Sequence, residues 1–166
     1  MRFAVDAMLG KLARWLRLLG YDTVYDQSHD DEALLTISKR ENRILVTRDG
    51  ELFKRASKEG VRSLLIHSTD ITGALMEISP FIKDSFLDSV GTRCTVCNAS
   101  LIEVDRSKIP SEDIPNISPL WSCPNCGKVY WHGSHWKGIE ERIKNIKNIK
   151  NIKKIKNIEN VRKPKR

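Results

Sequence analysis

The sequence predicts an α/β protein with a central parallel sheet, followed by a small cysteine-containing module and a basic tail. Two observations support the sheet: short apolar segments alternate with helical segments of about ten residues, and the first and third of them end on an aspartate. A third observation separates the small module, because all four cysteines lie between residues 94 and 126. At 166 residues the chain can hold one ordinary domain and a small addition.

The elements follow in order along the first half of the chain. MRFAVDA is a short strand ending at Asp6, and MLGKLARWLRLLGY is a helix whose leucines recur at helical spacing. Further strands are expected within 22–26, 43–49 and 61–68, helices within 28–42 and 50–60, and a last helical stretch over about 70–89. Right-handed crossovers bring all strand-to-helix loops to one edge of the sheet, where ligands bind in open α/β sheets.

The positive charge is concentrated at the end of the chain. Residues 143–166 contain ten Lys and Arg and one acid, which leaves 19 basic and 20 acidic side chains in the rest. The six isoleucines of the repeat IKNIKNIKNIKKIKNIEN are three residues apart, so they drift around a helix by about 60° each and form no continuous apolar face. The tail is interpreted as solvated or partly helical, or alternatively as an arm that orders on a polyanion such as RNA.

The N-terminal half delivers carboxylates to the predicted ligand edge. Asp6 ends the first strand, Asp30 and Asp31 open the helix after the second, and Asp49 ends the third. Crowded carboxylates raise one another's pKa unless a cation lies among them, and Mg²⁺ binds one or two carboxylates together with waters and substrate phosphate. The alternative is that Asp30, Asp31 and Asp49 only cap their helices.

Two Cys-x-x-Cys pairs, CTVC and CPNC, supply four thiolates at a spacing suited to a structural Zn²⁺ site. The ligands are Cys94, Cys97, Cys123 and Cys126. Asn98 and Gly127 suit the turn after each pair. The chain begins with no apolar block of signal-peptide length, so a cytoplasmic protein with reduced thiols is expected, and it has no apolar run long enough to span a membrane. His132 and His135 are candidates for additional ligands, although four cysteines already complete a tetrahedral shell.

The motifs VDAMLGKLARWLRLLGYDT, DDEALL and RILVTRD, followed by RCTVCNASL and CPNCGKVYWHGSHW, resemble the PIN-like RNase family named after the C-terminal domain of the Mut-seven exonuclease. The resemblance covers about residues 1–140. It implies a PIN-like three-layer α/β nuclease domain, a zinc ribbon and metal-dependent RNA cleavage with Mg²⁺ or Mn²⁺. Matched by motif, the catalytic acids are Asp6, Asp31 and Asp49. Asp30 can take the second position, and Asp70 is a candidate fourth acid.

Three units are therefore predicted: a nuclease domain over 1–90, a zinc ribbon over 91–140 and a basic low-complexity tail over 141–166. The predicted RNA-phosphate contacts are Lys11, Arg14 and Arg48, and Arg17 is expected beside the first two on the polar side of their helix. Tyr130, Trp131 and Trp136 either pack between the two modules or stack on RNA bases.

The function predicted is a metal-dependent ribonuclease, for which the sequence specifies RNA as the partner and no particular protein. The main alternative is a non-catalytic zinc-ribbon protein that binds ribosomal or transfer RNA. A phosphoacceptor receiver-like domain fits less well, because it needs paired acids directly after the first strand, where Asp6 is followed by Ala7 and Met8.

Overall fold

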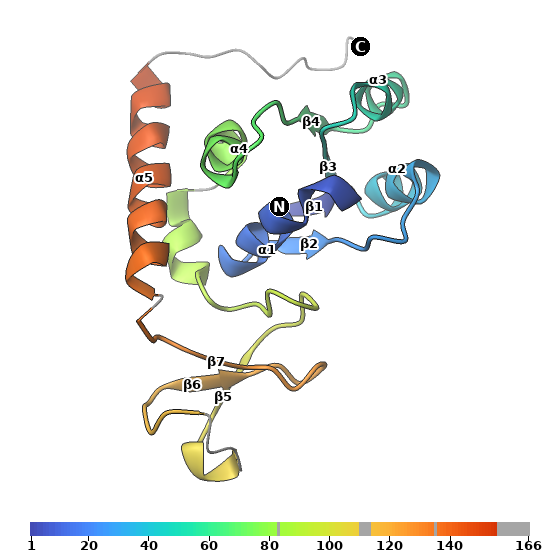
Figure 1. Cartoon of the computed structure of the whole chain (residues 1–166). Helices are drawn as coiled ribbons and strands as arrows, with labels where there is room; N and C mark the ends of the chain where they lie inside the picture. Colours follow the sequence, from blue (N-terminus) through green and yellow to red (C-terminus); the bar gives the residue numbers. More distant parts are fainter. Residues whose placement is uncertain (83, 110–113, 135, 156–166) are drawn as a thin grey trace.

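The computed structural model describes residues 1–82, 84–109, 114–134 and 136–155 of the chain (Figure 1). Four parallel strands form the central sheet in the order β2-β1-β3-β4, which confirms the predicted α/β class. The strands are Arg2–Val5 (β1), Asp22–Val24 (β2), Ile44–Thr47 (β3) and Ser63–Leu65 (β4). The helices that follow them are Gly10–Leu18 (α1), Asp31–Arg40 (α2), Gly50–Lys58 (α3) and Ile71–Ile78 (α4).

Helices cover both faces of this sheet, so the domain has three layers. Along β1, Phe3 and Val5 point to one face and Ala4 to the other, as the twofold alternation of a strand requires. The first face packs against α1 and α4, and the second against α2 and α3. The two separate cores fix the plane of the sheet and, with it, the edge at which the loops gather.

The turns between strands and helices follow a common pattern, in which an aspartate side chain accepts hydrogen bonds from the first backbone N–H groups of the helix. Asp30 caps α2, Asp49 caps α3 and Asp70 caps α4, while Asp6 caps the short 3₁₀ turn Ala7–Leu9 (η1) that precedes α1. Such caps satisfy backbone donors that have no partner inside the helix. Asp30 and Asp49 therefore do cap their helices, as the alternative interpretation proposed, whereas Asp31 is the first residue of α2 and not its cap.

The predicted helical stretch over 70–89 is broken into α4 and two 3₁₀ turns, Ser79–Phe81 (η2) and Asp84–Ser89 (η3). Pro80 stands at the start of η2 and lacks the N–H that would continue the α-helix. The chain then enters a small antiparallel sheet of Ile102–Val104 (β5), Leu120–Ser122 (β6) and Val129–Trp131 (β7), with the turn Arg106–Lys108 (η4) after β5. In Figure 1 this ribbon lies below β2, the edge strand of the large sheet.

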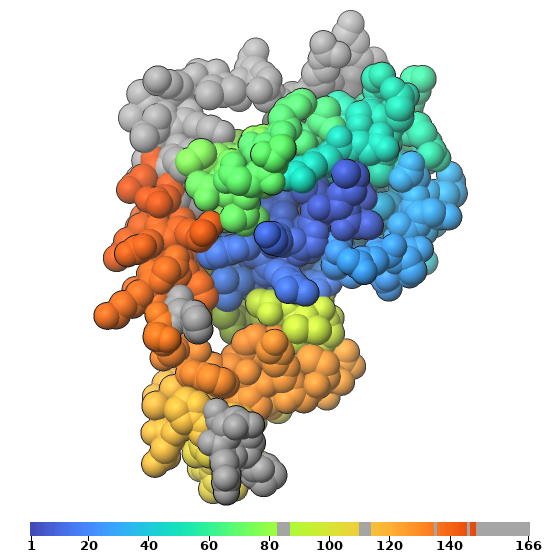
Figure 2. All heavy atoms as spheres, in the orientation of Figure 1, coloured from blue at the N-terminus to red at the C-terminus, as the bar shows by residue number. Residues whose placement is uncertain are grey.

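The last helix, Trp136–Ile155 (α5), leaves the ribbon and runs along the outside of α4 (Figures 1 and 2). It crosses residue 141, where the sequence predicts the tail to begin. Ile139 and Ile143 pack against the first core, and the Arg142 guanidinium lies 5.7 Å from the ring centre of Trp15. The first isoleucine of the repeat, Ile143, is thus buried, because this part of α5 packs against α4 and η2. None of the helices in the described ranges is both long and apolar enough to cross a membrane.

Candidate functional site

Asp6 and Asp49 lie at the carboxyl ends of β1 and β3, which are neighbours in the sheet. The chain runs from β1 outward to β2 and then returns across β1 to β3, so the sheet order reverses between these two strands. This switch point is where open α/β sheets bind ligands. The Asp6 side chain is half-buried and that of Asp49 is exposed, so a ligand from solvent can reach this position.

The Thr47 hydroxyl joins the two loops. It donates a hydrogen bond to Oδ2 of Asp6 at 2.7 Å and accepts one from the Asp49 backbone N–H at 2.8 Å. Thr47 itself is fully buried at the end of β3. Sequence reasoning missed this residue, although a polar side chain that ends the apolar run ILV, two positions before an aspartate, was an available signal.

Capping does not occupy both oxygens of Asp49. The N–H groups of Glu51 and Leu52 both donate to Oδ1, at 2.7 and 3.1 Å. Within the described residues, Oδ2 is therefore left for another ligand. The bond that caps Asp6, from Met8 N–H to Oδ1, is longer at 3.4 Å.

The second predicted acid position lies in the loop between β2 and α2, where Asp30 and Asp31 have different partners. Oδ1 of Asp30 accepts the Ala33 N–H at 2.8 Å. Asp31 points to Arg55 of α3, with 3.6 Å between charged atoms, and Glu32 binds the same guanidinium at 2.7 Å. Asp31 is thus held by a cation from the neighbouring helix, and no described hydrogen bond connects it to Asp6 or Asp49.

Asp70, the candidate fourth acid, caps α4 through the N–H groups of Gly73 and Thr72, which lower the pKa of its carboxyl below the usual value. Next to it, the Arg48 guanidinium donates to the backbone carbonyl of Ser68 in the loop after β4. Arg48 is therefore tied to protein backbone as well as lying beside Asp49.

Of the basic residues on α1, Lys11 and Arg14 are exposed. Lys11 lies in the first turn of α1, near the carboxylate edge, which is the edge of the sheet that carries Asp6 and Asp49. The expectation that Arg17 shares their polar face is wrong: only 4% of its surface is exposed. The residues that cover it come from positions 95 and 96, which helical periodicity cannot reveal.

The four cysteines converge at the end of the ribbon. All four Sγ atoms lie within 4.8 Å of one another. In a tetrahedral site with Zn–S bonds of about 2.3 Å, sulfurs lie about 3.8 Å apart, so the cluster has the size of a four-thiolate zinc site. The pKa of the Cys97 thiol is lowered to about 6, first by the Ala99 backbone N–H and then by the Asn125 side chain. The Lys128 backbone N–H lowers the pKa of Cys126, but burial and hydrogen bonds with the other three thiols outweigh it and raise that pKa to about 12.

The turns after the two cysteine pairs match as predicted: Asn98 and Gly127 both have positive φ, 73° and 70°. Among the described residues, this cluster is the one compact group of three or more potential metal ligands. The three predicted catalytic carboxylates do not form a second such group.

The aromatic segment after the second cysteine pair packs mainly within the protein. The Tyr130 hydroxyl lies 3.1 Å from Cys94 Sγ and accepts the Thr95 N–H at 3.2 Å. Trp136 stacks on His132 at 3.6 Å between ring centres, while Trp131 is 37% exposed. His135 lies outside the described residues.

These features define a class: a three-layer α/β domain with a polar switch point, joined to a ribbon whose four cysteines could hold a metal ion such as zinc. The family model described as the Mut7-C RNAse domain matches residues 1–143, and the chain belongs to that family. Membership supports a ribonuclease-type function and implies an RNA substrate. No curated protein and no solved structure matches the chain.

Proposed function

We propose that this chain is a ribonuclease that depends on a divalent cation, Mg²⁺ or Mn²⁺, bound at the switch point by Asp6 and Asp49. The observation that carries the proposal is the Thr47 hydroxyl, which donates to the Asp6 carboxylate on the neighbouring strand and accepts the backbone N–H of Asp49. Two carboxylates suffice for Mg²⁺, which keeps several waters and takes substrate phosphate as a further ligand. A compact cage of three acids is therefore not required.

Asp31 is proposed as the third acid, acting from the α2 side. Its partner Arg55 is 43% exposed and also binds Glu32, so Asp31 can turn away without leaving the guanidinium unpaired. Asp30 remains the alternative, and its Oδ1 is already used as a cap. Asp70 lies in the loop after β4, one strand further from the switch point than Asp49.

The ion, when bound, would lower the pKa of a water molecule and stabilise the oxygen that leaves on phosphodiester cleavage. The protein's part is to hold the carboxylates and to position the RNA. Lys11 and Arg14 are exposed on α1 and suited to phosphate contacts, whereas Arg48 would contribute from its anchored position. Trp131, with an exposed ring, is the best placed of the three aromatics for stacking on a base.

We further propose that the four cysteines hold one structural Zn²⁺. A piece as small as the ribbon has little core of its own, and a structural metal supplies folding free energy to such modules. Elemental analysis of purified protein should find one zinc per chain.

The rival function, non-catalytic RNA binding, is favoured by one observation: each proposed carboxylate already has a structural partner. Asp6 and Asp49 cap helical turns and Asp31 pairs with Arg55. The experiment that decides is incubation of the full chain with mixed cellular RNA, with and without Mg²⁺ or Mn²⁺, followed by mapping of the product ends. Cleavage that needs the cation and is lost in Asp6→Asn supports the nuclease; binding without cleavage supports the rival.

A further inference from the structure

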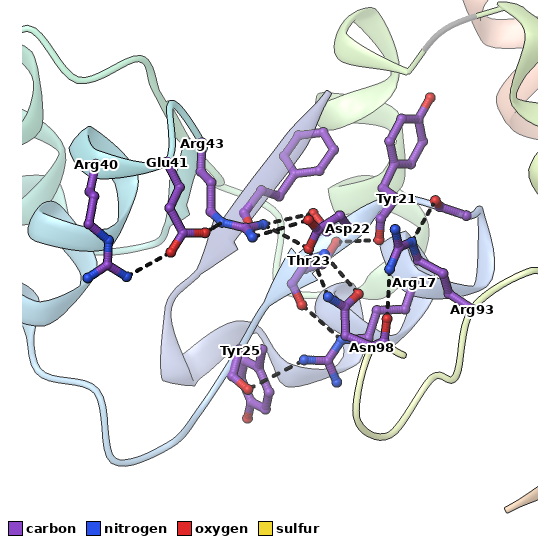
Figure 3. Close-up of polar contacts among 12 residues, drawn as sticks. Arg17, Tyr21, Asp22, Thr23, Tyr25, Arg40, Glu41, Arg43, Arg93 and Asn98 are labelled. Atoms are coloured by element: carbon purple, nitrogen blue, oxygen red, sulfur yellow. Dashed lines mark hydrogen bonds and ion pairs between the residues drawn. The ribbon is translucent and has the colours of Figure 1, made fainter. Parts of the chain in front are cut away.

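The ribbon covers the outer edge of β2. As the edge strand of the sheet, β2 presents backbone groups that have no neighbouring strand. The Thr23 N–H donates to the side-chain oxygen of Asn98 at 3.0 Å, and the Thr23 carbonyl accepts from Arg17 Nε at 3.0 Å. The Asn98 amide also donates to Asp22 at 2.8 Å (Figure 3). Asn98 directly follows Cys97, so the first cysteine loop (residues 94–98) takes the place of a further strand beside β2.

Arg17 joins the two modules from inside α1. Besides Thr23, its guanidinium donates to the carbonyls of Val96 at 2.6 Å and Thr95 at 3.3 Å, which lie between the two cysteines of the first pair. It also donates to the carbonyl of Tyr25 at 3.4 Å. A buried guanidinium is costly unless its donors are satisfied, and here the acceptors come from both modules. Neither module alone can satisfy Arg17.

Tyr25 continues this path to the carboxylate edge. Its hydroxyl donates to the carbonyl of Ala7 at 3.1 Å, and Ala7 directly follows Asp6. The same hydroxyl lies against Gly10, where an added Cβ would be only 2.5 Å from it. The tyrosine therefore fixes both ends of the turn between Asp6 and α1. Figure 3 shows Arg17 and Tyr25 side by side beneath β2.

We propose that the first cysteine loop, when its metal is bound, positions Asp6 through Arg17 and Tyr25. These two are positioning residues, since neither would contact the ion or the RNA. The inference rests on the proposed function, because it needs Asp6 to bind a divalent cation. It requires that metal in the ribbon and Mg²⁺ at the switch point strengthen each other's binding, since coupling between two sites is reciprocal.

Two variants interrupt the path at different points. Tyr25→Phe removes the bond to Ala7 and keeps the ring against Gly10. Arg17→Lys keeps a positive charge but cannot reach both sets of carbonyls. The matched control is Arg43→Lys, because Arg43 is also buried and also bonds to β2, through Asp22. It bonds to neither Arg17 nor Tyr25, and it reaches the cysteine loop only through Asp22, which also accepts from Asn98.

The measurement is zinc loss to a zinc-selective chelator that does not bind Mg²⁺, with and without saturating Mg²⁺. At equilibrium with the chelator, wild-type protein should bind zinc about fivefold more tightly in Mg²⁺, the lower end of usual coupling. In Tyr25→Phe this difference should vanish, the Mg²⁺ concentration for half-maximal thermal stabilisation should rise, and kcat should fall about tenfold with KM little changed. Arg43→Lys should melt earlier but keep the zinc–Mg²⁺ coupling and kcat.

Asp6→Asn serves as the reference that separates the two hypotheses. If Asp6→Asn is inactive while Tyr25→Phe keeps the wild-type coupling and kcat, the path through Tyr25 is refuted and the nuclease stands. If Asp6→Asn cleaves RNA like wild type, the proposed function itself fails. Should Arg17→Lys not fold, Tyr25→Phe alone decides, since it leaves every contact of Arg17 in place.

Discussion

Replacing Asp49 with asparagine separates helix capping from cation binding. The cap depends on Oδ1, which accepts N–H groups of Glu51 and Leu52. Asparagine offers a carbonyl oxygen in the same place and is about as good an N-cap as aspartate. The free energy of unfolding without added cation should therefore change by less than about 0.5 kcal/mol.

The substitution removes the negative charge, so its effect should be seen only with a divalent cation. A ligand at ten times its Kd stabilises a protein by about 1.4 kcal/mol. For a chain of this size that is a rise in Tm of about 4 °C. Wild-type protein should show this rise in Mg²⁺ and Asp49→Asn should lose most of it. Cleavage should fall by about 100-fold or more, beyond the effect of losing an outer partner of a metal ligand.

The assay is a melting curve and an RNA cleavage time course on the same preparations, each with and without Mg²⁺. Asp105→Asn is the matched control, because Asp105 is an exposed aspartate that caps the turn η4 in the ribbon through the Ser107 N–H. It should retain both cation response and cleavage. Wild-type cleavage by Asp49→Asn, or a loss of Tm without loss of activity, would refute the assignment and leave Asp49 as a cap.

Three further predictions concern single side chains, and a fourth concerns the charged residues 156–166. Thr47→Val keeps the shape of the side chain but removes the hydroxyl that binds the Asp6 carboxylate and the Asp49 backbone N–H, so kcat and the Mg²⁺-dependent rise in Tm should both decrease; unchanged values would exclude a role in the site. Arg55→Gln frees Asp31, so less Mg²⁺ should be needed for half-maximal cleavage if Asp31 is a ligand, and the titration should not move if it is not. Partial burial raises the pKa of Asp22, but hydrogen bonds from its arginine and asparagine partners lower it overall. The ionised carboxylate therefore stabilises the fold above the unfolded pKa of about 3.9, and this stabilisation is lost as pH falls through the lower folded pKa. Tm measured against pH should accordingly fall more steeply in acid for wild type than for Asp22→Asn. Deleting 156–166 removes five basic residues and one acid, so RNA affinity should weaken and its salt dependence flatten while cation-dependent cleavage persists; an unchanged salt slope would mean that these residues do not contact RNA.

Local pattern was sufficient to predict most of the nuclease domain. The alternation of strands and helices, the apolar faces and the capping role of Asp30 and Asp49 all depend on residues within a few positions of each other. The cysteine cluster was equally predictable, because metal coordination limits how four thiolates can be spaced. These features can be predicted without knowing which elements pack against one another.

Contacts between residues far apart in the chain could not be predicted from the sequence. Arg17 belongs to a basic series on α1, and only the approach of Val96, 79 positions away, explains its burial. The sequence indicated Asn98 only as a residue suited to the turn after the first cysteine pair, but its side chain also binds the edge strand at Thr23. Tyr130 looked like a stacking residue, but its hydroxyl contacts the cysteine cluster. For Arg17 and Asn98 the deciding partner comes from the other module, whereas for Tyr130 it lies 36 positions away within the ribbon.

The acids at the carboxylate edge need two separate explanations. A parallel sheet places every helix start on one side, and an aspartate caps η1, α2, α3 and α4, so an acidic edge would arise from capping alone. Capping acts within one loop and gives no reason for a bond between loops. The hydrogen bond from Thr47 to Asp6 is such a bond, since it joins adjacent strands at the switch point. Asp6, whose carboxylate is held by Thr47 of the neighbouring strand, is therefore the part of this edge that helix formation does not explain.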